Sequence, residues 1–134
     1  MPYICPNLRS VEESAVFDDG DCVALIRANV PGLRGTSHSG WRQGAPVVGE
    51  ARIARGTAIA TFDDGRFPNR SGIDHAAIFL AYGGAGIWVL EQRGGNDSAT
   101  VQRRFIPTGQ PGHSGAFSAP GNAAAAFSVI ELRG

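Results

Sequence analysis

The sequence is poor in cysteine: it has only Cys5 and Cys22 in 134 residues. Two cysteines are too few for a disulfide scaffold, and neither has the paired spacing or the histidine partners of a structural zinc site. His38 and His113 lie in Gly/Ser-rich segments without metal-ligand spacing to another His, Cys or acid. We therefore expect neither a metal nor any other cofactor.

Excess charge of one sign and long apolar runs are also missing. Twelve basic residues balance twelve acidic ones, so no net field attracts the chain to nucleic acid or to an anionic membrane. No segment has the length of a membrane span, and the first ten residues lack the basic stretch and apolar run of a secretory signal. We expect a protein made in the cytoplasm, without a membrane span or a nucleic-acid partner.

The composition is that of a globular domain: 43% of residues are hydrophobic and 18% are charged. A chain of 134 residues is long enough to bury a core of its own. Its 19 glycines indicate a loop-rich fold that contains strands. We predict one domain that spans residues 1–134.

Two helices are predicted near the N-terminus. Residues 8–17 have apolar side chains at helical spacing, and residues 22–30 do so again until Pro31 and Gly32 stop the pattern. Residues 32–56 are rich in Gly, Ser and Arg, and Trp41 in this segment indicates a loop that packs on the body of the protein.

The rest of the chain favours strands. Alternating or continuous apolar runs predict strands at residues 58–62, 75–82, 87–92, 100–106 and 127–132. The second and third of these form a hairpin around the glycine-rich residues 83–86. Helices first and an antiparallel sheet afterwards predict an α+β fold, with N-terminal helices packed on the sheet and the site where the second helix meets it.

Cys22 is the first candidate for chemistry because it opens the second predicted helix. Asp21 before it is a good cap residue, and the positive end of the helix dipole favours a thiolate. Unsatisfied backbone N–H groups at this position can also hold an oxyanion. The alternative is that Cys22 is a small buried hydrophobic residue without reactivity.

His75 and an acid on the next strand are candidates for the base and its orienting residue. A thiol nucleophile needs a base that is near in space and distant in sequence, and His75 leads a predicted strand. Glu91 could accept the Nδ1 proton of His75 and hold the ring toward Cys22. A symmetric hairpin would place Gln92, and not Glu91, on the face of His75, whereas a bulge would reverse this; Gln92 therefore stays as the substitute.

These segments together resemble a known family. In order, GDCVALI at residues 20–26, Trp41, the strand at residues 56–62, DHAAI at residues 74–78 and VLEQ at residues 89–92 are similar to the papain-like peptidoglycan amidases of the NlpC and CHAP types. The resemblance implies a papain-like fold and a cysteine peptidase triad at Cys22, His75 and Glu91. Asp21 stands where CHAP enzymes commonly have Gln.

The resemblance also implies a function. A small chain without wall-binding repeats is similar to the amidase effectors that bacteria inject through the type VI secretion system, which cut peptidoglycan peptides in the periplasm and are blocked in the producer by an immunity protein. Two alternatives remain open: a phage or housekeeping lysin of the same chemistry, and a non-catalytic wall-binding module on the same fold.

Overall fold

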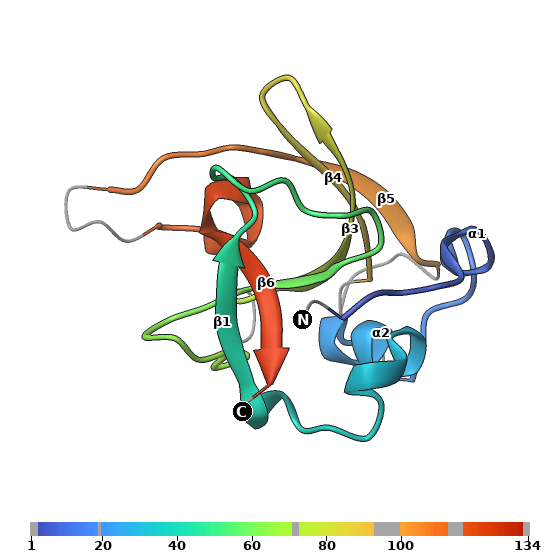
Figure 1. The fold of residues 1–134 in the computed structure, drawn as a ribbon. Helices are drawn as coiled ribbons and strands as arrows, with labels where there is room; N and C mark the ends of the chain where they lie inside the picture. Colours follow the sequence, from blue (N-terminus) through green and yellow to red (C-terminus); the bar gives the residue numbers. More distant parts are fainter. Residues whose placement is uncertain (1–2, 19, 71–72, 93–99, 113–116, 133–134) are drawn as a thin grey trace.

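The computed structural model describes residues 3–18, 20–70, 73–92, 100–112 and 117–132. The fold is α+β, with short helices near the N-terminus followed by an antiparallel sheet (Figure 1). The helical elements are α1 (Leu8–Val11), α2 (Cys22–Asn29), η1 (Pro31–Leu33), η2 (His38–Gly40), η3 (Pro120–Asn122) and η4 (Ala124–Ala126). The strands are β1 (Trp41–Pro46), β2 (Ala58–Thr61), β3 (Ala76–Gly83), β4 (Gly86–Glu91), β5 (Gln102–Pro107) and β6 (Phe127–Leu132).

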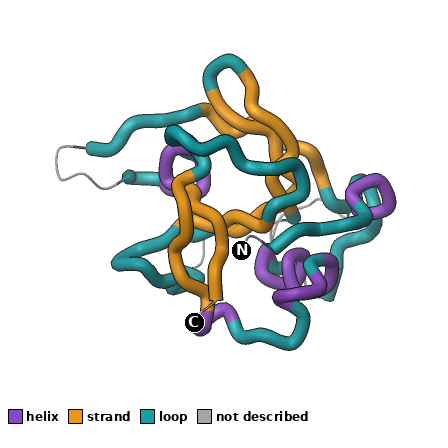
Figure 2. The backbone as a smooth tube through the Cα atoms, viewed as in Figure 1, coloured by secondary structure: helices purple, strands orange, loops and turns teal. Residues whose placement is uncertain are grey.

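The six strands form one sheet in the order β1-β6-β2-β3-β4-β5, and every neighbouring pair is antiparallel. The last strand of the chain, β6, is inserted between β1 and β2 (Figure 1). The strands curve around one side of the molecule, and the helices α1 and α2 lie together on another (Figure 2). Among the described residues, no helix combines the length and the apolar character needed to span a bilayer.

Apolar side chains pack on both faces of the sheet. On one face, Leu25 and Ile26 of α2 pack with Ile78 and Leu90 in a cluster that also includes Cys22. On the other face, a second cluster contains Phe79, Phe127, Val47 and Ala124 of the 3-10 helix η4. Because both faces are covered, β2 and most of β3 are fully buried.

The second predicted helix is confirmed. Helix α2 begins at Cys22 and ends at Asn29, just before Pro31. Asp21 caps it, because its side chain accepts a hydrogen bond from the backbone N–H of Val23 at 3.3 Å. The strands predicted at residues 58–62, 75–82, 87–92, 100–106 and 127–132 correspond to β2–β6; both ends of the last one match, and the ends of the others are shifted by at most two residues.

The first predicted helix was too long. Helix α1 ends at Val11, and the chain then turns extended at Glu12 and left-handed at Glu13, where φ is 65°. The backbone N–H of Glu13 donates to the Val101 carbonyl at 3.0 Å, and the N–H of Val101 donates to the Ser14 carbonyl at 2.8 Å. Pairing with a distant segment therefore replaces the helical hydrogen bonds that the local pattern favoured.

Strand β1 was missed, since its residues were predicted as loop. The segment contains Gly44 and Pro46, which are poor strand residues, and the strand that it pairs with is β6, more than 80 positions along the chain. The expectation that this region packs on the body is confirmed at Trp41, which is fully buried and lies 5.3 Å from the Phe67 ring, centroid to centroid.

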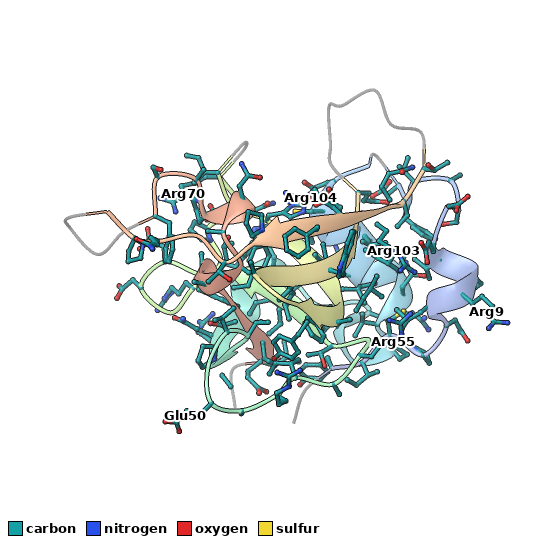
Figure 3. The ribbon with its side chains drawn as sticks, turned by 90° about the horizontal axis from the view of Figure 1, so that it is seen from above. Arg9, Glu50, Arg55, Arg70, Arg103 and Arg104 are labelled. Atoms are coloured by element: carbon teal, nitrogen blue, oxygen red, sulfur yellow. The ribbon has the colours of Figure 1, made fainter. Side chains whose placement is uncertain are left out.

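A bulge in the β3–β4 hairpin decides which side chains share a face. The hairpin closes symmetrically around Gly84 and Ala85, and its register shifts between Phe79 and Ala81. Below this shift Ile78 pairs with Leu90, so β4 is displaced by one residue relative to a regular hairpin. The carbonyl of Leu80, the extra residue, accepts a hydrogen bond from Nη1 of Arg55 at 3.3 Å (Figure 3 shows Arg55).

Candidate active site

Cys22 lies at the N-terminal end of α2, where this end of the helix meets the start of β3. Cys22 is only 5% exposed and belongs to the core cluster beneath α2. The backbone of Ala76, the residue directly after His75, hydrogen-bonds to its sulfur. Because successive Cα atoms are about 3.8 Å apart, the sulfur lies against the segment that carries His75.

The electrostatic surroundings of the thiol differ from the sequence expectation. Burial, followed by the negative charge of Asp21, raises the pKa of Cys22 to about 12, although hydrogen bonds from the backbone of Ala76, Val23 and Cys22 itself lower it. The helix N-terminus was expected to favour the thiolate, but its effect is smaller than the cost of burying an anion. The resting residue is therefore a thiol, and a base must take its proton.

The backbone of His75 is fixed by a short polar network. Its N–H donates to Oγ1 of Thr61 at 3.1 Å, and that hydroxyl donates to Oδ1 of Asp74 at 3.4 Å. Asp74 in turn accepts from Nε of Arg70 at 2.9 Å (Figure 3 shows Arg70). Burial raises the pKa of Asp74, but the hydrogen bonds from Arg70 outweigh it, so that the pKa lies below its usual value.

The imidazole of His75 is paired with Glu91. Nε2 of the ring lies 2.7 Å from Oε1 of Glu91, and the two residues are 7% and 4% exposed. A bulge at Leu80, inside β3 and not in the glycine-rich turn, brings Glu91 to the face of His75, which is one of the two alternatives left open by the sequence. The expected ring nitrogen was wrong, since Nε2 and not Nδ1 contacts the carboxylate.

This pairing fixes the tautomer of the ring. Burial raises the pKa of Glu91, but interactions with His75 and Arg104 lower it by more, so the carboxyl is ionised and can only accept. Nε2 therefore carries a hydrogen, and in the neutral ring Nδ1 is the nitrogen that can accept a proton.

Arg104 is a site residue that the sequence analysis missed. Its Nε donates to Oε2 of Glu91 at 2.8 Å, on the carboxylate oxygen that His75 leaves unused. Its other nitrogens donate to the Gly121 carbonyl at 3.0 Å and to Oδ1 of Asn122 at 3.1 Å. Figure 3 shows Arg104 pointing away from the position of Arg103, as expected of neighbours on one strand. Glu91 pairs with Gln102 on the adjacent strand β5, and Arg104 follows Gln102 by two residues. Because side chains alternate along a strand, this spacing places Arg104 on the same face as Glu91 and was a signal available in the sequence.

The 3-10 helix η3 closes the other side of the His75 ring. A Cβ added to Gly121 would lie only 3.2 Å from Cβ of His75, so a side chain there would push against the histidine. The ring of Phe127 meets the imidazole edge-on at 6.4 Å between centroids. The ring is thus held by Glu91, η3 and Phe127 together.

Gln92 lies on the face opposite to Glu91 and holds the segment that leads into α2. Its Oε1 accepts from the Phe17 N–H at 2.8 Å, and its Nε2 donates to the carbonyls of Phe17 at 3.0 Å and of Asp21 at 2.7 Å. The residue is only 2% exposed. Gln92 therefore positions the residue before Cys22 and does not contact the imidazole as a substitute for Glu91.

The described residues contain no group of three or more His, Cys, Asp and Glu side chains that could hold a metal ion. His38 packs against the Phe67 ring at 5.9 Å between centroids, and His113 lies outside the described residues. The polar contacts that the structure shows join His75, Glu91 and Arg104, and the sulfur of Cys22 contacts the backbone of Ala76, directly after His75.

Comparison with known proteins identifies the family. The model of the family described as "Domesticated amidase effector 2" matches residues 2–127. The chain belongs to this family. Among the members of the amidase effector 2 family, a type VI secretion amidase effector 2 protein from Salmonella typhi is 35% identical over 136 residues, covering 98% of this chain and 100% of the relative.

Other relatives extend the family beyond bacteria. A domesticated amidase effector 2 from Ixodes scapularis is 33% identical over 99 residues, which cover 73% of this chain and 68% of that protein. A solved structure of type 6 secretion amidase effector 2 has 35% identity and a TM-score of 0.86, over 100% of this chain and 97% of that one. The amidase effector 2 fold therefore accounts for the whole architecture described above.

Proposed function

We propose that this chain is a cysteine amidase in which Cys22 is the nucleophile, His75 its base and Glu91 the orienting acid. The observation that carries the proposal is the buried His75–Glu91 pair at 2.7 Å, together with a cysteine at a capped helix N-terminus whose sulfur is hydrogen-bonded by the backbone of Ala76, directly after His75. A helix-start cysteine and a strand-start histidine in this relation support a papain-like fold of the NlpC/CHAP type.

The reaction we propose is acyl transfer. Nδ1 of His75 takes the thiol proton as the sulfur of Cys22 attacks the amide carbonyl, and the C–N bond breaks when the imidazolium protonates the leaving amine. Water then attacks the thioester with His75 as base, which releases the acid and restores the thiol. A thiol with a pKa raised to about 12 makes proton transfer part of the attack and not a preceding equilibrium.

The oxyanion of the tetrahedral intermediate needs donors beside the sulfur. Asp21 already occupies the next two N–H groups of α2: its side chain accepts from Val23 at 3.3 Å and its carbonyl from Ala24 at 3.1 Å. We propose the Cys22 N–H, at the positive end of the helix, as the oxyanion donor; in the resting structure it hydrogen-bonds to its own sulfur.

The substrate we propose is a peptide amide of bacterial peptidoglycan. The relative from Salmonella typhi is a type VI secretion amidase effector, which supports an antibacterial role for this chain in the periplasm of a target cell. A producer of such an effector needs an inhibitor of its own, so a neighbouring gene for a small secreted inhibitor favours the effector over a lysin of the same chemistry.

Incubation of the purified protein with peptidoglycan sacculi tests the proposal. We expect new free amines and cleaved muropeptides, whose masses identify the bond that is cut. Cys22→Ala should abolish both, whereas the matched variant Cys5→Ala, which removes the other buried thiol, should retain them. Digestion that persists in Cys22→Ala would remove Cys22 from the mechanism.

One observation favours a second candidate function. Cys22 is as buried as an ordinary core thiol, which is what a non-catalytic wall-binding module on this fold would show. Such a module would co-sediment with sacculi, release no amines, and bind equally well as Cys22→Ala.

A further inference from the structure

Asn122 is an exposed residue whose side chain is held in one orientation. It is the last residue of η3, and its Oδ1 accepts a hydrogen bond from Nη1 of Arg104 at 3.1 Å. Nη2 of the same guanidinium donates to the Gly121 carbonyl at 3.0 Å, so the backbone of η3 is held as well. A guanidinium can only donate, so the atom of Asn122 that it contacts is the oxygen, and the amide nitrogen points away from it.

The amide nitrogen of Asn122 keeps two donors for a ligand. No residue that the structure describes accepts a hydrogen bond from this Nδ2. Arg104, which fixes the amide, is itself half-buried and is fixed through Nε by Glu91 at 2.8 Å. A donor that is oriented before its ligand arrives loses little side-chain entropy on binding, so it binds an acceptor more tightly than a mobile side chain does.

A chain of hydrogen bonds joins Asn122 to the imidazole of His75. Oδ1 of Asn122 accepts from Arg104, whose Nε donates to Oε2 of Glu91. The other oxygen of Glu91, Oε1, lies 2.7 Å from Nε2 of His75. The backbone gives a second connection, because a Cβ on Gly121 would lie 3.2 Å from Cβ of His75. Consecutive Cα atoms are about 3.8 Å apart, so Asn122 lies at the rim of the proposed site, one residue beyond this contact.

We propose that Asn122 binds the substrate peptide, with Nδ2 donating to a carbonyl oxygen on the amine side of the amide that is cut. The imidazolium of His75 protonates the leaving nitrogen, so that nitrogen lies within hydrogen-bond distance of the ring. The acyl side of the peptide stays with Cys22, and the part beyond the nitrogen therefore passes over the histidine toward η3.

This inference rests on the proposed function and deepens it, because it assigns a substrate-binding residue to the leaving-group side of the site. Arg104 then has two roles: its Nε holds the carboxylate of Glu91, and its Nη1 orients the amide of Asn122. The acid that orients the base and the donor that binds the peptide are thus positioned by one guanidinium.

Asn122→Asp separates substrate binding from a structural role. The aspartate keeps an acceptor oxygen for Arg104 and replaces Nδ2 by a second acceptor. If Asn122 only held η3 in place, the aspartate would hold it at least as well, because charge-assisted hydrogen bonds are the stronger ones. Weaker peptide binding in Asn122→Asp therefore reports the lost donor. Asn122→Ala removes the donor and the bond to Arg104 together.

Binding is measured separately from turnover, in full-length protein that also carries Cys22→Ala. The probe is a cross-linked peptide dimer purified from sacculi, and the readout is its dissociation constant in titration calorimetry. We expect Asn122→Asp and Asn122→Ala each to weaken binding roughly 3- to 10-fold, as the loss of one hydrogen bond predicts.

Asn7→Asp is the matched control, because it makes the same change of charge at another exposed asparagine. Asn7 precedes α1 and makes no side-chain cap hydrogen bond. Helix α1 lies on the other side of the molecule from residues 120–126 (Figure 1). The dissociation constant of Asn7→Asp should equal that of the Cys22→Ala parent.

The outcomes separate this inference from the proposed amidase activity. An unchanged dissociation constant in Asn122→Asp would overturn the inference even if Cys22 cleaves peptidoglycan, and so would weaker binding in Asn122→Ala alone, which assigns a structural role. Failure of the Cys22→Ala parent to bind the dimer would overturn it together with the proposed substrate. Weaker binding in both variants, when the unmodified protein cleaves nothing, would retain Asn122 as a peptide-binding residue and reject the amidase activity.

Discussion

Arg104 donates from Nε to Oε2 of Glu91 at 2.8 Å, on the side of the carboxylate opposite to the imidazole of His75. Both oxygens of this buried acid therefore have a charged or polar donor. A carboxylate with these two partners stays ionised and holds one orientation. Residues of both β4 and β5 therefore position the ring of His75.

Replacement of the acid by its amide tests this arrangement. Glu91→Gln keeps the shape but removes the charge that fixes the tautomer of His75, and we expect kcat on wall peptides to fall by roughly 10² to 10⁴. The melting temperature should change far less than the activity. Activity within twofold of the unmodified protein would show that Glu91 does not orient the base.

Arg104 should affect the pH dependence of the reaction. Since Arg104 helps to keep the pKa of Glu91 below its usual value, Arg104→Met should raise that pKa. The loss of activity at acid pH should then begin at a higher pH than in the unmodified protein. The measurement is kcat/KM against pH.

Arg103→Met is the matched control for this profile. Arg103 pairs with Glu12 at 2.9 Å on the surface, away from Glu91, and exposed ion pairs contribute little. Its pH profile should coincide with that of the unmodified protein. An identical acid limb in both variants would contradict the role given to Arg104.

Gln92 should matter for stability as well as activity. Gln92→Ala leaves the N–H and carbonyl of Phe17 and the carbonyl of Asp21 without their partner, at a cost of about 2–3 kcal/mol in the free energy of unfolding. Urea unfolding measures this cost. Gln43→Ala, which removes one bond from an exposed glutamine to Ser128, should cost less than about 0.5 kcal/mol. Equal effects of the two substitutions would show that the segment before α2 does not depend on Gln92.

The buried thiol predicts slow alkylation. In a Cys5→Ala background, iodoacetamide should modify Cys22 slowly at pH 7, and the rate should rise about tenfold per pH unit up to pH 10 because only the thiolate reacts. A rate that levels off below pH 8 would contradict a pKa of about 12.

The same raised pKa has a consequence for stability. A thiol whose pKa is higher in the folded chain than in the unfolded chain stabilises the fold fully below the ordinary thiol pKa. This contribution is lost as the pH rises through the folded value. The free energy of unfolding should therefore decrease in alkaline solution, and less so in Cys22→Ala.

Local patterns in the sequence were sufficient for the elements that make their own hydrogen bonds or pair with a neighbour in the chain. Helix α2, its cap at Asp21 and the β3–β4 hairpin are of this kind, and all were predicted. Strand β1 and the early end of α1 depend on partners more than 80 residues away, and no local pattern contains them.

The site divides in the same way. The residue types and their order indicated Cys22, His75 and Glu91, and the structure brings the last two into contact. The ring nitrogen that faces Glu91 and the raised pKa of Cys22 depend on burial and on the path of the chain around the imidazole. Neither is encoded in the spacing of residues along the chain.

Leu80 is the extra residue of the bulge in β3. A change of chain length at this position therefore alters which side chains share a face of the sheet. Deleting Leu80 could leave every strand in place, but it would exchange the faces of the sheet on which Glu91 and Gln92 lie. The amide of Gln92 would then meet the imidazole, and the carboxylate of Glu91 would turn toward the carbonyls of Phe17 and Asp21, which repel it. Length changes at the Gly84–Ala85 tip have no such effect, so natural variation in chain length should accumulate at the tip and be excluded from the bulge.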